Sequence, residues 1–236
     1  MDSWLDSLLS IIAPHMCKGC DWLGATLCRR CIFNIVSRKY DRCINCSCQV
    51  SPADFAKRGS LCSACAKVLP FARIFVVGER RGALLKLVGD FKYNGERASA
   101  RVIAKLLDAT IPPLTNDVII TAIPTAPPHV RQRGFDHAEL IARWFAKMRR
   151  RKFAKLLRRE TNQSQHDLGA RDRRILAAKM FSSRETAPAR ILLIDDIWTT
   201  GATTTAAAKL LRKSGAREVD LAIVARQVGV HRARKI

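Results

Sequence analysis

Two adjacent carboxylates and a hydroxyl-rich turn form the stretch of the chain with the clearest chemistry. Asp195 and Asp196 follow the apolar residues 191–194, and a Thr-Thr-Gly turn then leads into an Ala/Leu-rich segment. Gly allows a tight turn, so the free N–H groups at the start of the next helix can bind a monophosphate. Carboxylates accept hydrogen bonds from sugar hydroxyls and attract Mg²⁺. The stretch predicts a ribose 5-phosphate site whose phosphate loop is Thr199, Thr200, Gly201, Ala202 and Thr203.

The plainer alternative for this stretch is a buried strand that ends in a solvated Asp pair, with Thr and Gly as turn residues. Two other parts of the chain favour the phosphate site. Arg131 and Arg133 precede a glycine near a helix start, an arrangement that suits a polyphosphate. Lys92 stands at a helix break, where it either reaches a phosphate or is a solvated cation.

Eight of the nine cysteines fall into four Cys-x-x-Cys pairs near the start of the chain. This spacing is typical of zinc knuckles, and eight thiolates suffice for two tetrahedral sites. We expect the pairs to be used sequentially because the short first gap can fold back on itself, although spacing alone leaves interleaved pairing open. Cys48 is left over, as a substitute for Cys46 or as a free thiol. The predicted zinc ligands are Cys17, Cys20, Cys28, Cys31, Cys43, Cys46, Cys62 and Cys65.

Length and composition favour a folded protein with an acidic partner. The 236 residues, 48% of them hydrophobic, suit one α/β domain with a small accessory domain. No stretch is long enough to cross a bilayer, and residues 1–14 indicate a short amphipathic helix, not a signal peptide. Cysteine pairs of the zinc type favour the cytoplasm. The net charge of +22 points to nucleic acid, with a generally basic surface as the alternative.

A change in composition after Pro70 divides the chain. Residues 1–70 form the predicted zinc region, and residues 71–236 alternate strand and helix patterns. The apolar central strands predict a parallel sheet flanked by helices. We expect strands at residues 73–78, 118–123, 153–159, 191–194 and 219–225, and helices at residues 82–92 and 96–109, after Asp136 and after Gly201.

Positive charge is concentrated in one part of the chain. Residues 129–190 contain 17 Lys or Arg against 6 Asp or Glu, a net +11 that is half of the charge of the whole chain. The run Arg149-Arg150-Arg151-Lys152 lies beyond a helix end. We expect this run to contact the backbone of single-stranded DNA in a salt-dependent way. Residues 160–174 are expected to form a polar loop.

The segment 190–203 resembles the phosphoribosyl pyrophosphate (PRPP) motif of type I phosphoribosyltransferases. It has four aliphatic residues, Asp-Asp, and Thr-Thr-Gly with a further Thr. The cysteine pairs, LVGDFKYNGER, AIPTAPPHVRQRGFDHAEL and residues 165–181 extend a likeness to the ComF family over nearly the whole chain. This resemblance implies an α/β fold in which a double zinc ribbon precedes a type I phosphoribosyltransferase-like domain.

The resemblance also implies roles for individual residues. Asp195 and Asp196 would be the catalytic carboxylates that hold the ribose hydroxyls of Mg²⁺-PRPP, and residues 199–203 would hold the 5-phosphate. The implied contacts to pyrophosphate and phosphate are Pro124, Thr125, Lys92, Arg131 and Arg133.

Three functions follow from the resemblance. The chain would bind Mg²⁺-PRPP and handle single-stranded DNA during natural competence or DNA uptake. Alternatively, it would transfer phosphoribose to an unidentified nucleophile, or regulate nucleotide metabolism in response to PRPP. Protein partners would be a competence helicase or a membrane channel. The sequence leaves open whether catalysis occurs.

Two departures from the family pattern bear on the site. Asp136 and His137 stand where the family usually has Asn-Gln, and an extra carboxylate weakens anion binding unless a cation offsets it. Leu176 stands where an Asn is common. We expect His137 and His166 to be hydrogen-bonding surface groups and not general bases.

Overall fold

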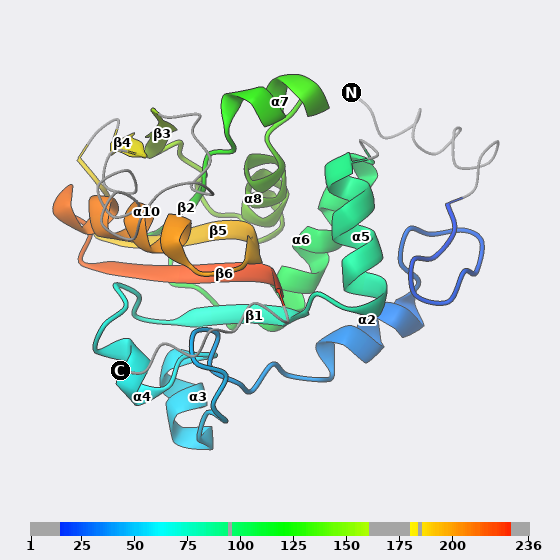
Figure 1. Ribbon diagram of the computed structural model, residues 1–236, viewed down its shortest axis with the longest axis horizontal. Coiled ribbons are helices and arrows are strands. Elements are labelled where there is room, and N and C mark those ends of the chain that lie inside the picture. Colours follow the sequence, from blue (N-terminus) through cyan, green and yellow to red (C-terminus); the bar gives the residue numbers. More distant parts are fainter. Residues whose placement is uncertain (1–14, 94–95, 161–179, 184–185, 228–236) are drawn as a thin grey trace.

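The computed structural model describes residues 15–93, 96–160, 180–183 and 186–227. Its centre is a sheet of four parallel strands in the order β1-β6-β5-β2 (Figure 1). The strands are β1 (Ile74–Glu79), β2 (Val118–Ala122), β5 (Arg190–Trp198) and β6 (Glu218–Arg226). The larger helices are α5 (Gly82–Tyr93), α6 (Ala98–Thr110), α8 (His137–Met148) and α10 (Ala202–Lys213). The predicted α/β fold with a parallel sheet flanked by helices is confirmed.

Successive side chains of a strand point to opposite faces of the sheet, so the apolar strands contribute to two cores, one on each face. Leu192 and Ile194 of β5 belong to the core that contains the buried faces of α5, α6 and α8. Ile191 and Leu193 belong to the other core, which contains α10 and the second cysteine segment. All four residues are at most 2% exposed, as expected of a central parallel strand covered on both faces.

The cysteine segments pack against the α/β core. Cys17, Leu27 and Cys31 share a core with residues of β1, α5 and α6. Short helices accompany these segments: α2 (Arg29–Val36), α3 (Pro52–Arg58) and α4 (Ser63–Ala66). The backbone also joins the two parts, because Ser60 N–H donates to the carbonyl of Ile74 in β1 at 2.7 Å. The division into domains at residues 70 and 71 stays a prediction.

Several elements differ from the predicted ones. Strand β5 continues through the Asp pair to Trp198, because its backbone stays in register with β6, with Asp195 opposite Ile223. Residues 127–133 form a helix that was not predicted, α7 (Pro127–Arg133), which proline at its first positions favours. Arg131 and Arg133 lie in its last turn and, as expected, precede Gly134 and the start of α8. The expected strand at 153–159 is shorter, and pairs as β3 (Leu157–Arg159) with an unexpected β4 (Phe181–Ser183).

Some predictions lie outside the described residues. They concern the helix at 1–14, the loop beyond residue 160, His166 and Leu176. Among the helices that the structure does describe, none combines the length and the apolar character needed to cross a membrane.

Part of the basic run after α8 has an internal role. Arg149 pairs with the carboxylate of Asp108 on α6 and also donates to the carbonyls of Asp108 and Ile111. Arg151 donates to the carbonyl of Leu114 at 2.7 Å. These two arginines therefore tie the end of α8 to the connection between α6 and β2. The sequence had suggested that this run contacts a DNA backbone. The side chains of Arg149 and Arg151 instead make bonds within the fold.

Replacing Arg149 by Ala is expected to lower the free energy of unfolding by about 1–3 kcal/mol, because carbonyls and a carboxylate lose a charged donor. The control is Arg150→Ala, since the Arg150 side chain is exposed. Its effect should stay within about 0.5 kcal/mol. Urea denaturation of both variants measures the difference, and equal midpoints would contradict the assigned role.

Candidate functional site

A cleft of about 500 Å³ opens at the carboxyl ends of β2 and β5. The two strands are neighbours, with Ala122 paired to Ile194, so the loops that follow them lie side by side. The structure thus brings together most of the residues that the sequence had suggested. Those that line the cleft are Lys92, Pro124, Thr125, Arg133, Asp195, Asp196, Thr199, Gly201, Ala202 and Thr203. Thr200 and Arg131 are exposed and are not part of this lining.

The Asp pair lies inside the strand, not beyond its buried part as its position after the apolar run had suggested. Asp196 is 8% exposed and accepts an ion pair from Lys92, whose Nζ lies 2.8 Å from its Oδ2. Lys92 comes from the last turn of α5. Lys92 is therefore neither a solvated cation nor free for a phosphate in this structure, because it neutralises a buried carboxylate.

Asp195 has a different environment. It accepts a hydrogen bond from the backbone N–H of Asp196 at 2.9 Å. Burial raises the pKa of Asp195 to about 8, and the neighbouring Asp196 carboxylate adds to the shift, while Lys92 opposes it. At a pH between the ordinary pKa of a carboxyl and this value, Asp195 keeps its proton in the folded protein and loses it in the unfolded chain.

The turn after β5 has the geometry expected of a phosphate loop. Gly201 has φ 72°, and a Cβ there would lie 2.2 Å from the ring of Trp198. Only glycine fits both constraints. The turn opens α10, and Thr204 anchors it by donating its hydroxyl to the carbonyl of Gly201 at 3.0 Å. The first residues of α10, Ala202 and Thr203, line the cleft, and the start of a helix is a place where backbone N–H groups can bind an anion.

Asp136 fixes the loop after β2. Its side chain accepts hydrogen bonds from the backbone N–H and the hydroxyl of Thr125, at 2.8 and 2.9 Å. It also caps α8 by accepting the N–H of Glu139 at 3.1 Å. This carboxylate, which departs from the family pattern, is thus fully used in local structure.

His137 is buried, at 1% exposure, and not a surface group as expected. Its Nε2 lies 3.2 Å from the carbonyl of Phe91, so Nε2 carries the proton and donates it. Its Nδ1 then accepts from Arg133 at 3.4 Å. Burial lowers the pKa of His137, and the charge of Arg133 lowers it further. A neutral His137 therefore joins α8 to α5 directly beneath Lys92.

Sequence reasoning missed several residues that line the cleft, among them Arg159 and Trp198. Arg159 lines it and donates to the carbonyl of Pro124 at 3.5 Å. Burial lowers the pKa of Arg159, and the carboxylates of Asp195 and Asp136 oppose that shift. Trp198 is 2% exposed, and its ring packs against Gly201 in the turn after β5. Arg159 was hidden in a generally basic segment, and the position of Trp198 within the motif carries no fixed residue type.

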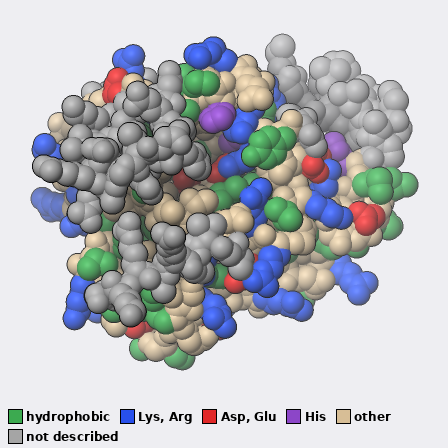
Figure 2. Space-filling view, in the orientation of Figure 1, with side chains coloured by type: hydrophobic (Ala, Val, Ile, Leu, Met, Phe, Trp, Pro, Cys, Tyr) green, Lys and Arg blue, Asp and Glu red, His purple; other side chains and the backbone are tan. Residues whose placement is uncertain are grey.

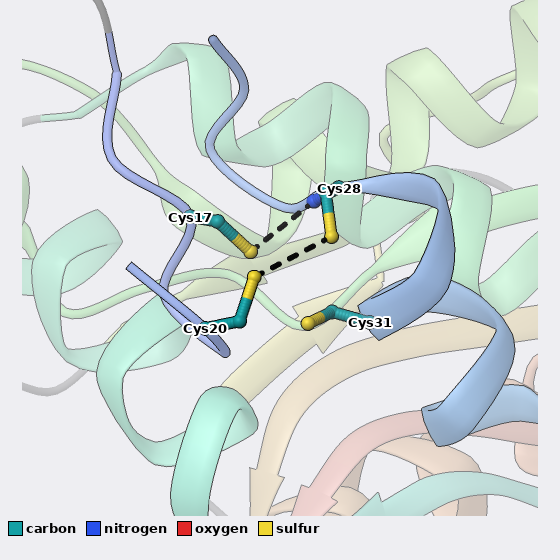
Figure 3. Close-up of side chains that lie close together, drawn as sticks. All are labelled: Cys17, Cys20, Cys28 and Cys31. Atoms are coloured by element: carbon teal, nitrogen blue, oxygen red, sulfur yellow. Dashed lines mark hydrogen bonds between the residues drawn. The ribbon is translucent and has the colours of Figure 1, made fainter. Parts of the chain in front are cut away.

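The four cysteines of the first segment converge on one point (Figure 3). The sulfur atoms of Cys20 and Cys28 are 3.7 Å apart, and Cys28 N–H donates to the sulfur of Cys17 at 3.3 Å. A tetrahedral zinc site with Zn–S bonds of about 2.3 Å has sulfur atoms about 3.8 Å apart. The arrangement fits zinc.

The second segment repeats this arrangement with Cys43, Cys46, Cys62 and Cys65. Within each group all sulfur atoms lie within 4.8 Å of one another, so the sequential pairing is confirmed. The sulfur of Cys48 lies 3.4 Å from that of Cys46 but belongs to neither group. Arg226 at the end of β6 joins this segment to the sheet by donating to Ser47 Oγ at 2.6 Å.

Among the residues that the structure describes, the basic side chains in view do not form one continuous surface. Figure 2 shows Lys and Arg side chains spread over this face with Asp and Glu between them. Some are used within the fold, since Glu139 pairs with both Arg143 and Lys155 at 2.8 Å. The charge of residues 129–160 is therefore partly internal, and the cleft itself holds the cations Lys92, Arg133 and Arg159.

Two proteins of known name are similar to this chain. Competence protein F of Haemophilus influenzae is 27% identical, over 82% of this chain and 94% of that protein. Competence protein ComFC of Streptococcus pneumoniae is 30% identical, over 55% of this chain and 57% of that protein. No protein-family model matches the chain. These relatives, together with the cysteine groups, confirm the resemblance to the ComF family.

Two zinc ions per chain are expected in protein purified without chelator, one in each cysteine group. Cys28→Ser should reduce the content to one, because it removes a ligand of the first group. Cys48→Ser should leave it at two, since Cys48 lies outside both groups. Elemental analysis measures the ratio, and wild-type protein without zinc, or loss of a zinc ion in the Cys48 variant, would contradict this assignment.

Asp195→Asn is expected to raise stability at pH 8. The pKa of Asp195 is higher in the folded protein than in the unfolded chain. Its contribution to the free energy of unfolding is therefore fully present below the ordinary carboxyl pKa and is lost as the pH rises to about 8. The variant should unfold with a free energy larger by at least about 1.4 kcal/mol, the equivalent of one pKa unit. Asp196→Asn is the matched control and should destabilise, because Lys92 loses its partner.

Denaturation of the wild type and both variants between pH 4 and 8 tests the sign, since Asp195→Asn should remove this decline of stability with pH, whereas Asp196→Asn should only reduce it by removing the smaller cause of the raised pKa. Equal pH dependence in the wild type and Asp195→Asn would show that Asp195 is ionised throughout.

Proposed function

We propose that this relative of the ComF family binds Mg²⁺-PRPP in the cleft at the carboxyl ends of β2 and β5, and handles single-stranded DNA during natural competence. The single observation that carries the proposal is the convergence of three segments in one cleft of about 500 Å³. These are the Asp pair with its phosphate loop, the loop fixed by Asp136, and the last turn of α5.

Each segment suits one part of the ligand. The N-terminal turn of α10 suits the 5-phosphate, since its residues line the cleft and the first N–H groups of a helix bind anions. Asp195 and Asp196 suit the ribose hydroxyls, which donate to carboxylates. Lys92, Arg133 and Arg159 suit the pyrophosphate, whose charge Mg²⁺ shares when it is bound.

Binding of this ligand requires rearrangement around Lys92. In this structure Lys92 is paired with Asp196 at 2.8 Å, and Thr125 is hydrogen-bonded to Asp136. Ribose hydroxyls and Mg²⁺ at Asp196 would release Lys92 toward the pyrophosphate. The hydrogen bond between Thr125 and Asp136 holds the loop after β2 in place. It does not need to break, because Arg133 and Arg159 supply positive charge for the pyrophosphate.

The role in competence is supported by the names of the two relatives, both of which are called competence proteins. The involvement of DNA is supported by the net charge of +22.

A second candidate is a phosphoribosyltransferase that transfers phosphoribose to an unidentified nucleophile. This activity is favoured by the Asp pair and the three cations Lys92, Arg133 and Arg159 in one cleft. Departure of pyrophosphate needs electrostatic stabilisation rather than a general base. A regulator that only senses PRPP would use the same binding contacts.

Calorimetric titration with PRPP and Mg²⁺ tests the proposal. Wild-type protein should bind, and Asp195→Asn and Lys92→Met should each weaken binding by roughly tenfold or more, equivalent to about 1.4 kcal/mol for one charged contact. Lys86→Met is the control, since Lys86 lies at the exposed start of α5. No heat and no NMR response at millimolar PRPP would reject the ligand.

The same titration in the presence of single-stranded DNA separates the candidate functions. Consumption of PRPP favours the transferase, DNA binding without consumption favours the competence role, and PRPP binding alone favours the regulator. DNA affinity should fall linearly with salt on logarithmic axes, because neutralised phosphates release counterions.

A further inference from the structure

The first cysteine segment lies along the helix that carries Lys92 into the cleft (Figure 1). At the start of α5, a Cβ on Gly19 would be 3.4 Å from Ala83, and Asp21 pairs loosely with Lys86 at 3.7 Å. Gly19 also packs so tightly against Cys31 that a Cβ would lie 2.6 Å from its sulfur. The metal loop therefore contacts α5 directly.

Lys18, which lies between two of the predicted zinc ligands, spans the junction of α5 and α6. Its Nζ is 2.7 Å from Asp90 in the last turns of α5 and 3.4 Å from Glu96, which precedes α6. The side chains of Lys18, Asp90 and Glu96 are 16–27% exposed, so these pairs are screened less than surface pairs. His15 adds a second contact to Glu96 at 3.4 Å.

The backbone around Lys18 is held by hydrogen bonds within the loop that carries the cysteines. Lys18 N–H donates to the carbonyl of Thr26 at 3.0 Å, and Cys17 N–H donates to that of Trp22 at 2.8 Å. A zinc ion at the four cysteines would fix this loop. The ammonium group of Lys18 would then hold Asp90, two residues before Lys92, at a set position.

We propose that Lys18 is a positioning residue for Lys92, through which the first cysteine site sets the shape of the ligand cleft. The chain of contacts runs from the cysteine group to Lys18, then to Asp90 and the last turn of α5, and then from Lys92 to Asp196. The second cysteine group contributes to the core on the opposite face of the sheet, with α10. Loss of metal from the first site alone should therefore loosen Lys92.

Hydrogen exchange in the intact zinc-loaded protein tests this without any ligand. Lys18→Met should speed exchange at the end of α5, around Phe91 and Tyr93, by about threefold to tenfold, while the strands keep their protection. Lys18→Arg keeps both ion pairs and should restore protection. Lys86→Met is the matched control, because it removes the exposed contact between the same two segments.

A second arm measures PRPP affinity and rests on the proposed function. Lys18→Met should weaken it by about threefold to tenfold, with two zinc ions retained, and Lys18→Arg should recover most of it. In a Lys92→Met background the Lys18 change should have no further effect. Unchanged exchange in Lys18→Met, an equal change in Lys86→Met, or loss of zinc from Lys18→Met would overturn the inference. Absence of PRPP binding by the wild type would reject only the proposed function.

Discussion

Two carboxylates stand next to each other in a central parallel strand, and burying such a pair costs free energy unless cations or protons neutralise it. The fold supplies both remedies. Lys92 reaches from α5 to pair with Asp196, and Asp195 has a raised pKa, with Arg159 nearby. Helix α5 and strand β3 place Lys92 and Arg159 where they meet this requirement. A ligand that brings hydroxyl donors and Mg²⁺ would meet the same need.

The neutralising groups must in turn be held by contacts outside the cleft. His137 supports the end of α5, Asp136 fixes the loop after β2, and Lys18 connects the first cysteine group to Asp90. Much of the positive charge of this chain thus has a structural use, as the internal bonds of Arg149 illustrate. These bonds leave the net charge of +22 unchanged, but they reduce the number of arginine side chains that are available to contact an acidic partner.

Local patterns in the sequence predicted the elements and the contents of the cleft well. The short gap between the first two cysteine pairs favoured sequential groups over interleaved ones, and the structure has the sequential groups. The Thr-Thr-Gly turn and the helix after Asp136 were predicted because capping and glycine turns depend on neighbouring residues. What the sequence did not reveal depends on distant contacts. The burial of His137 under α5, the ion pair of Lys92 with Asp196, and the internal bonds of Arg149 each join residues more than thirty positions apart.

The central claim is that the Asp pair and its neutralising cations form a ribose phosphate site. A crystal structure of the protein with Mg²⁺ and PRPP tests it most directly. The account predicts the 5-phosphate on the backbone N–H groups of residues 201–203, with Asp195 and Asp196 on the ribose and Lys92 moved from Asp196 to the pyrophosphate. An intact ion pair between Lys92 and Asp196, with an empty cleft at saturating ligand, would contradict it.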